Sequence, residues 1–136
     1  MPEKQVISTP RAPQAIGPYS QAIRTDPFIF VSGQIPLEPG TGQLITGDIE
    51  AQTRQTLENL KAILEAAGSS LDKAVKTTIY LTRIEDYAAV NKVYSEYFNS
   101  QKSGMPARSV MAVAGLPRGA GVEIEAIALV GGGIES

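Results

Sequence analysis

Histidine and cysteine are both missing from the 136 residues of the chain, and their absence removes most of the usual catalytic side chains. Without cysteine the chain has neither disulfides nor a thiol nucleophile, which fits a cytoplasmic protein. Without histidine only oxygen ligands remain for a metal ion, so we expect no zinc or iron site. Any chemistry must use a guanidinium, carboxylates, hydroxyls, backbone groups and water.

Blocks of charge and long apolar runs are missing as well. The 12 basic and 14 acidic residues give a net charge of −2, and the basic residues are scattered along the chain. Nucleic acid binding as the main role is disfavoured, because it depends on clustered cations. No apolar run approaches ~18 residues, so we expect no membrane span, and we expect no signal peptide. The length and a hydrophobic content of 43% suit one globular domain over residues 1–136.

Hydrophobic spacing predicts two helices. From 48 to 67, apolar residues recur every three or four positions, with Asp48 as a plausible N-cap and Gly68 as the stop. The second helix is predicted from a stripe of apolar and aromatic residues between 90 and 98. The preceding segment, 82–85, resembles a capping box.

Strand signals occur at 6–7, 20–25, 28–34, 74–81, 108–114 and 122–130. The order β-β-β-α-β-α-β-β predicts an α+β fold, a mixed β-sheet with two helices packed on one face. Because the late strands are apolar on both faces, the uncovered face favours a homo-oligomer. A sheet that curls on itself in a monomer is the alternative. We expect the tail, 131–136, to be frayed.

Arg108 lies in the segment Pro106-Ala107-Arg108-Ser109, at the head of a nearly uncharged run. An arginine fixed at the edge of apolar structure is suited to bind a carboxylate through two parallel hydrogen bonds. An ion pair with a structural carboxylate is the alternative interpretation. The remaining arginines lie in more polar or loop contexts: Arg11, Arg24, Arg54, Arg83 and Arg118.

Two segments near the N-terminus carry further candidates. Tyr19 either packs in a turn with its hydroxyl satisfied or is positioned over a pocket. Gly33, at a strand end, either forms the turn out of the strand or lets a ligand approach the backbone. The adjacent Ser32 is not a triad nucleophile, because the chain has no histidine.

The last predicted strand carries two carboxylates, Glu123 and Glu125. Strand alternation places both on one face together with Ile127 and Leu129. The other face, with its small and branched residues, is expected to pack against the helices. The carboxylates either mark a solvated strand end or, in a functional interpretation, Glu123 holds and orients a water molecule.

These motifs in this order resemble the RidA/YjgF family of enamine/imine deaminases. The resemblance covers nearly the whole chain without an insertion or deletion that breaks it. The matching segments are Gly17-Pro18-Tyr19-Ser20-Gln21-Ala22, Val31-Ser32-Gly33-Gln34, Gln52-Thr53, Asn91, Pro106-Ala107-Arg108-Ser109 and Val122-Glu123-Ile124-Glu125-Ala126.

The resemblance implies a chorismate-mutase-like fold and a homotrimer with three pockets at subunit interfaces. It also implies hydrolysis of reactive 2-enamines and 2-imines, such as 2-aminoacrylate and 2-iminobutanoate, to 2-oxo acids and ammonia. By the same resemblance, these intermediates would be ones released by pyridoxal-phosphate-dependent dehydratases that act on serine and threonine. Neither a cofactor nor a metal is expected.

Family roles transfer onto this chain position by position. Arg108 would bind the substrate carboxylate, and Glu123 would hold the attacking water. The pocket would be lined by Tyr19, Ser32 and Gly33, with Asn91 at a polar position nearby. We expect Tyr19 and Arg108 of one pocket to come from neighbouring subunits. Val110 stands where many bacterial relatives have cysteine, so redox control through a thiol at that position is excluded.

Two other functions use the same residues differently. One is a ribonuclease or translation inhibitor, an activity also attributed to members of this family. The other is a non-catalytic regulator that binds carboxylate ligands in the pocket. The sequence alone does not separate a site that binds 2-oxo acids from one that turns over imines.

Overall fold

The computed structural model describes residues 3–98 and 104–135 of the chain. Its element order is the predicted one, with three short 3-10 helices added at Leu71–Lys73, Ile84–Asp86 and Pro117–Gly119. The α+β class is therefore confirmed. The strands and helices are β1 (Gln5–Ile7), β2 (Ala22–Thr25), β3 (Phe28–Gln34), α1 (Ile49–Ala66), β4 (Ala74–Leu81), α2 (Tyr87–Phe98), β5 (Ala107–Ala112) and β6 (Val122–Leu129).

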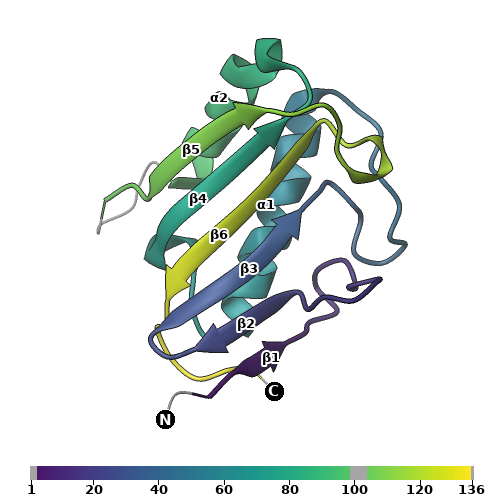
Figure 1. Ribbon diagram of the computed structural model, residues 1–136. Helices are drawn as coiled ribbons and strands as arrows, with labels where there is room; N and C mark the ends of the chain where they lie inside the picture. The colour runs from purple at the N-terminus through teal and green to yellow at the C-terminus, as the bar shows by residue number, and fades with distance from the viewer. Residues whose placement is uncertain (1–2, 99–103, 136) are drawn as a thin grey trace.

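All six strands form one mixed sheet in the order β1-β2-β3-β6-β4-β5 (Figure 1). The last strand in sequence, β6, lies at the centre and pairs antiparallel with both β3 and β4. The edge strand β5 pairs with β4 in parallel. The topology therefore puts Glu123 of β6 in the middle of the sheet and Arg108 of β5 at its edge.

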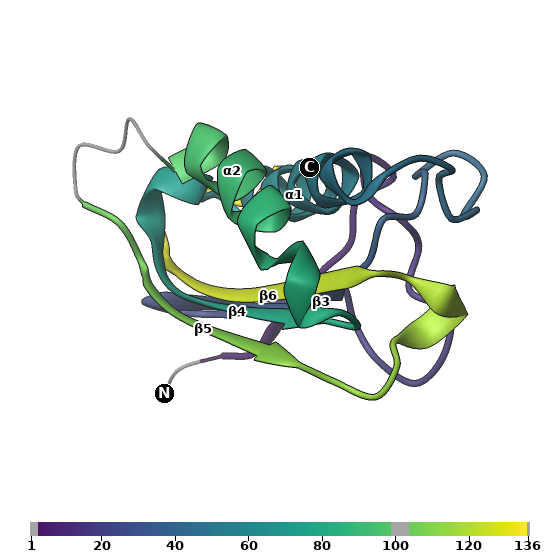
Figure 2. The same cartoon turned by 90° about the horizontal axis from the view of Figure 1, so that it is seen from above.

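Both helices lie on the same face of the sheet (Figure 2). The helix-facing side chains of β6 are buried, whereas Glu123, Glu125 and Ile127 are half-buried and Leu129 is exposed on the other face. The predicted division of β6 into two faces is thus confirmed. The face without helices leaves large apolar side chains at the surface: Val6, Phe28, Phe30, Met111 and Leu129.

Helix α1 begins and packs as its sequence predicts. The side chain of Asp48 accepts a hydrogen bond from the N–H of Ala51 at 2.9 Å, which caps the helix. The apolar face of α1 packs against β6, β3 and α2, and Leu57, Leu60 and Ile63 are fully buried. Such burial contributes about 1.5–3 kcal/mol for each large side chain.

The predicted capping box at 82–85 is wrong. Arg83 keeps an extended backbone, and a 3-10 turn over Ile84–Asp86 leads into α2 without a side-chain cap. The N–H of Thr82 instead donates to the carbonyl of Gly121, which continues the contact between β4 and β6. The backbone of Thr82 therefore pairs with the segment before β6, and the capping hydrogen bonds that its sequence suggested do not form.

The prediction of a frayed tail is also wrong for residues 131–135. The N–H groups of Gly131 and Gly132 donate to the carbonyl of Gly68 at 2.8 and 2.7 Å, and that of Glu135 donates to Ala66. The guanidinium of Arg24 donates to the carbonyls of Ala67 and Gly132. These contacts fix the tail against the C-terminal end of α1.

Arg24→Ala should lower the free energy of unfolding by about 2–4 kcal/mol, because two carbonyls lose a charged donor in a buried setting. The side chain of Arg24 is only 11% exposed. Arg83, with a side chain 70% exposed and a 3.9 Å ion pair to Glu85, is the matched control. Arg83→Ala should cost less than about 0.5 kcal/mol. Urea unfolding followed by circular dichroism measures both, and equal losses would contradict the assignment.

Within the part of the chain that the structure describes, neither α1 nor α2 is both long enough and apolar enough to cross a membrane.

Candidate functional site

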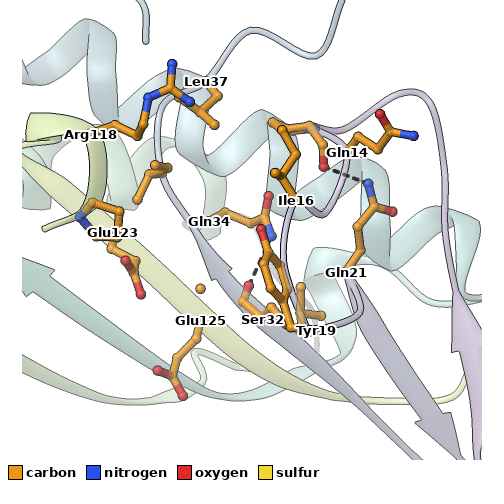
Figure 3. Close-up of a pocket in the computed structure, with 15 residues that line it drawn as sticks. Gln14, Ile16, Tyr19, Gln21, Ser32, Gln34, Leu37, Arg118, Glu123 and Glu125 are labelled. Atoms are coloured by element: carbon orange, nitrogen blue, oxygen red, sulfur yellow. Dashed lines mark hydrogen bonds between the residues drawn. The ribbon is translucent and has the colours of Figure 1, made fainter. Parts of the chain in front are cut away.

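A cavity of about 690 Å³ opens where the end of β3 meets the start of β6 (Figure 3). Segment 13–21 forms one wall, and the 3-10 turn at 117–119 contributes Pro117 and Arg118. The predicted residues Tyr19, Ser32, Gly33 and Glu123 all line this cavity. Apolar side chains, among them Ile16 and Leu37, complete the lining. The structure thus brings four of the six predicted site residues together.

The carboxylate of Glu123 occupies the space that Gly33 leaves free. A β-carbon built on Gly33 would lie 2.7 Å from the carboxyl carbon of Glu123 and 3.0 Å from its Cγ. Such contacts are too close for any side chain, so glycine is required for this placement. The pairing of β3 with β6 is irregular between Val31 and Gln34, which is where Gly33 lies. An irregularity of this kind often re-aims side chains at a functional site.

Burial raises the pKa of the Glu123 carboxyl above its ordinary value, and the negative charge of Glu125 raises it further. Glu125 is held on the same face by Tyr80, whose hydroxyl donates to its Oε1 at 2.8 Å. A carboxylate with a raised pKa is a stronger base than one in water, which suits a group that accepts a proton from water.

Hydrogen bonds fix the opposite wall of the cavity. The hydroxyl of Ser32 donates to the carbonyl of Ser20 at 2.6 Å. The buried side chain of Gln21 binds the backbone of Thr9 and donates to the carbonyl of Pro13 at 2.8 Å. Tyr19 remains 54% exposed, so its phenol is available to a ligand. The packed alternative for Tyr19 therefore does not apply within one chain.

Arg118 lines the cavity although its sequence context suggested only a polar loop. Its backbone has a φ of 63°, a left-handed conformation that is uncommon outside glycine. Figure 3 shows its guanidinium pointing away from the carboxylates of Glu123 and Glu125. The signal that could have identified it is its position in the short loop that leads into β6.

Arg108 and Asn91, the other two predicted site residues, do not line this cavity. Arg108 donates from Nη1 to Oδ1 of Asn91 at 2.7 Å and from Nη2 to the hydroxyl of Tyr87 at 2.9 Å. Its guanidinium carbon lies 4.9 Å from the centre of the Tyr94 ring. Among residues 3–98 and 104–135 no carboxylate pairs with Arg108, so the structural ion pair considered from sequence is not formed there.

Strand register explains why Arg108 and Glu123 of one chain do not lie in the same cavity. Arg108 lies opposite Thr77, which is buried beneath the helices, and Glu123 lies opposite Tyr80. Thr77 and Tyr80 are an odd number of residues apart, so they point to opposite faces of β4. A single chain therefore places the predicted site residues in two separate groups, one around Glu123 and one around Arg108. Val110 faces the helices beside Arg108 and packs against the core.

Comparisons with known proteins agree with this architecture. Residues 9–130 match the family described as Endoribonuclease L-PSP. The chain belongs to the RidA/YjgF family. This RidA family member is 54% identical over 125 residues to a RutC family protein of Pyrococcus horikoshii, covering 92% of the chain and 97% of that protein. It is 48% identical over 128 residues to the human 2-iminobutanoate/2-iminopropanoate deaminase, covering 94% and 91%.

A solved relative shows the same fold with a small molecule. The structure of Escherichia coli TdcF with bound serine superposes on this RidA family member with a TM-score of 0.88 at 45% identity. The match covers 93% of this chain and 98% of TdcF. The predicted family and fold are thereby confirmed.

Proposed function

We propose that this RidA family member hydrolyses 2-imino acids and their 2-enamine tautomers to 2-oxo acids and ammonia. The observation that carries the proposal is the half-buried carboxylate of Glu123, held over Gly33 in a cavity lined by apolar and hydroxyl side chains. The 48% identity to the human imine deaminase supports the same reaction. The expected substrates are 2-aminoacrylate and 2-iminobutanoate released in the cytoplasm by pyridoxal-phosphate-dependent dehydratases.

The reaction needs a substrate held in a fixed orientation and a base that accepts a proton from water. An imine carbon is already electrophilic, so water can attack it once the substrate is held in place. Glu123 accepts a proton from that water as the C–O bond forms and the C=N electron pair moves to nitrogen, which takes up a proton to give the carbinolamine. Glu123 then returns its proton to the amino group, the C–N bond breaks as the C=O bond forms, and ammonia leaves with the 2-oxo acid as the other product. Arg108 binds the substrate carboxylate, while Tyr19, Ser32 and Gly33 line the pocket. Asn91 acts on substrate through Arg108, to which it is hydrogen-bonded.

The proposed assembly is a homotrimer in which Arg108 of one subunit completes the pocket of its neighbour. Two observations support it. The sheet face without helices exposes Phe28, Phe30 and Leu129 at 39–44%, which is unfavourable for an isolated chain in water. Arg108 also lies at the sheet edge with its charge uncompensated by the described carboxylates.

The ribonuclease alternative requires a phosphodiester to enter the same cavity. Among the residues that the structure describes, Glu123 and Glu125 line it with Arg118 as the one cation beside them, so the cavity lining carries more negative than positive charge, which disfavours a backbone with a negative charge on every phosphate. The ligand-sensing alternative is closer to the proposal, since a relative has been crystallised with serine. Sensing and turnover differ in whether the rate of ammonia release changes.

A coupled assay separates these functions. A threonine dehydratase generates 2-iminobutanoate, and the appearance of 2-oxobutanoate and ammonia is followed with and without the protein. Faster release supports the deaminase. Binding of 2-oxobutanoate without a change in rate supports the sensor, and cleavage of RNA that is lost in an Arg108→Ala variant supports the ribonuclease.

The pH dependence of kcat/KM should report Glu123. Its carboxylate is the active form, so activity should fall as the pH drops through its raised pKa. Glu125→Gln removes one of the two causes of that raised pKa, so the acidic limb should move to lower pH. Burial, the larger cause, remains. Glu65→Gln, on α1 and outside the cavity lining, is the control and should leave the acidic limb at the same pH. An acidic limb at the same pH in Glu125→Gln and in the wild type would contradict the effect of Glu125 on the pKa of Glu123.

A further inference from the structure

The surroundings of Arg108 contain a residue that the sequence motifs did not single out. Tyr87, Asn91 and Tyr94 lie on one face of α2, at spacings of four and three residues. Asn91 accepts from Nη1 of Arg108 at 2.7 Å, and the hydroxyl of Tyr87 accepts from Nη2 at 2.9 Å. The ring centre of Tyr94 is 4.9 Å from the guanidinium carbon. Three side chains of one helix thus hold the group from three directions.

Tyr94 forms the rigid part of this arrangement. It is 1% exposed, its hydroxyl shares a 2.7 Å hydrogen bond with Thr77, and its ring stacks on Phe98 at 4.4 Å between centres. Tyr87 is different, because it is 41% exposed and its hydroxyl has Arg108 as its partner. The core therefore does not depend on the Tyr87 hydroxyl, whereas the orientation of Arg108 does.

We propose that Tyr87 is a positioning residue for substrate binding, and that its hydroxyl fixes the plane of the Arg108 guanidinium. One hydrogen bond to Asn91 leaves the guanidinium free to rotate about that contact, and the second removes this freedom. Both acceptors are neutral, so Arg108 keeps its full charge. Among residues 3–98 and 104–135, two of its five N–H donors have acceptors, and the other three are enough to bind a carboxylate with two parallel bonds.

This inference rests on the proposed role of Arg108 in carboxylate binding. If it is correct, the Tyr87 hydroxyl acts on substrate only through Arg108. The effect of removing it should then appear in the affinity for carboxylate ligands and should depend on the residue at position 108. A purely structural role would instead lower thermal stability and would persist whatever residue occupies position 108.

Tyr87→Phe is the test variant, since it keeps the ring and removes one hydroxyl. Tyr97→Phe is the matched control on the same helix, where the hydroxyl donates to Glu58 at 2.6 Å. With Tyr87→Phe, the KM for 2-iminobutanoate and the Kd of 2-oxobutanoate should rise about three- to tenfold, the value of one lost hydrogen bond. The kcat should change less than about twofold, and the midpoint of thermal unfolding should match that of the wild type. Tyr97→Phe should leave both KM and Kd unchanged.

The decisive comparison repeats Tyr87→Phe in an Arg108→Lys background. Lysine lacks the second nitrogen that reaches Tyr87, so the additional loss should fall below about twofold. A loss of the same size in both backgrounds, or wild-type KM and Kd for Tyr87→Phe, would overturn the inference. Full activity of Arg108→Ala would instead refute the proposed role of Arg108, and wild type that neither binds 2-oxobutanoate nor turns over the imine would overturn both.

Discussion

Arg108→Ala is expected to lower kcat/KM for 2-iminobutanoate by roughly 100-fold or more, the value of two charge-assisted hydrogen bonds of about 1.5–3 kcal/mol each. The fold should remain intact. Arg108 lies on an edge strand, and its hydrogen-bonding partners, Asn91 and Tyr87, are half-buried and exposed, so water can replace the guanidinium. The loss would therefore report substrate binding and orientation.

Arg108→Lys separates charge from geometry. Lysine keeps the positive charge, but its single ammonium group cannot form the planar fork that matches a carboxylate. Nor can one nitrogen hold both Asn91 and Tyr87 as the guanidinium does. We expect an intermediate loss of about tenfold, equivalent to one of the two directed hydrogen bonds. A lysine variant as active as wild type would mean that charge alone is sufficient.

Steady-state kinetics in the dehydratase-coupled assay measure both variants, and thermal unfolding shows whether the fold is kept. Near-normal deamination by Arg108→Ala would refute the assignment. Co-expression of Arg108→Ala with Glu123→Gln subunits tests the shared pocket. If neighbouring subunits supply the two residues, roughly a quarter of the pockets in a random mixture contain both, and activity reappears. If one chain supplied both, the mixed assembly would stay inactive.

Local signals predicted the elements of this fold well. The N-cap at Asp48, the apolar spacing of α1 and the alternation along β6 each depend on residues close in sequence, and each is found in the structure. The capping box at 82–85 and the frayed tail failed because distant partners decided them. Thr82 pairs with Gly121, and the tail binds Gly68 and Arg24. The residue spacing within either segment does not identify these distant partners.

The candidate site residues were predicted one by one, and the expectation that neighbouring subunits supply Tyr19 and Arg108 came from the family resemblance, because the spacing of the motifs does not show which residues lie apart in one chain. The separation follows from the sheet order, in which β4 lies between β5 and β6, and from which face each side chain takes. Arg118 and Tyr87 were missed for a related reason. Arg118 lies in the turn before β6, and Tyr87 is the first residue of α2, ahead of the apolar stripe at 90–98 from which that helix was predicted. Only the packed chain brings Arg118 to the cavity and Tyr87 to Arg108.

Glu123→Gln should reduce kcat about 100-fold or more, within the range for loss of a general base, while the KM changes little. Glutamine has nearly the same shape, so the packing over Gly33 and the fold are retained. The amide cannot accept a proton from water, and water alone must then carry the proton away. Glu125→Gln, on the same face and also lining the cavity, is the matched control and should keep most of the activity near neutral pH.

Gly33→Ala tests whether the position of the Glu123 carboxylate matters as well as its ability to accept a proton. The added methyl group would meet the carboxyl group and Cγ of Glu123, so this flexible side chain must swing away while its charge is kept. If the carboxylate must lie over Gly33 to orient water, Gly33→Ala should lose activity nearly as severely as Glu123→Gln with a smaller loss of stability than a core substitution. Retained activity in Gly33→Ala would show that Glu123 acts from another position. Activity in both variants would remove Glu123 from the reaction, and Tyr19 would become the residue to test.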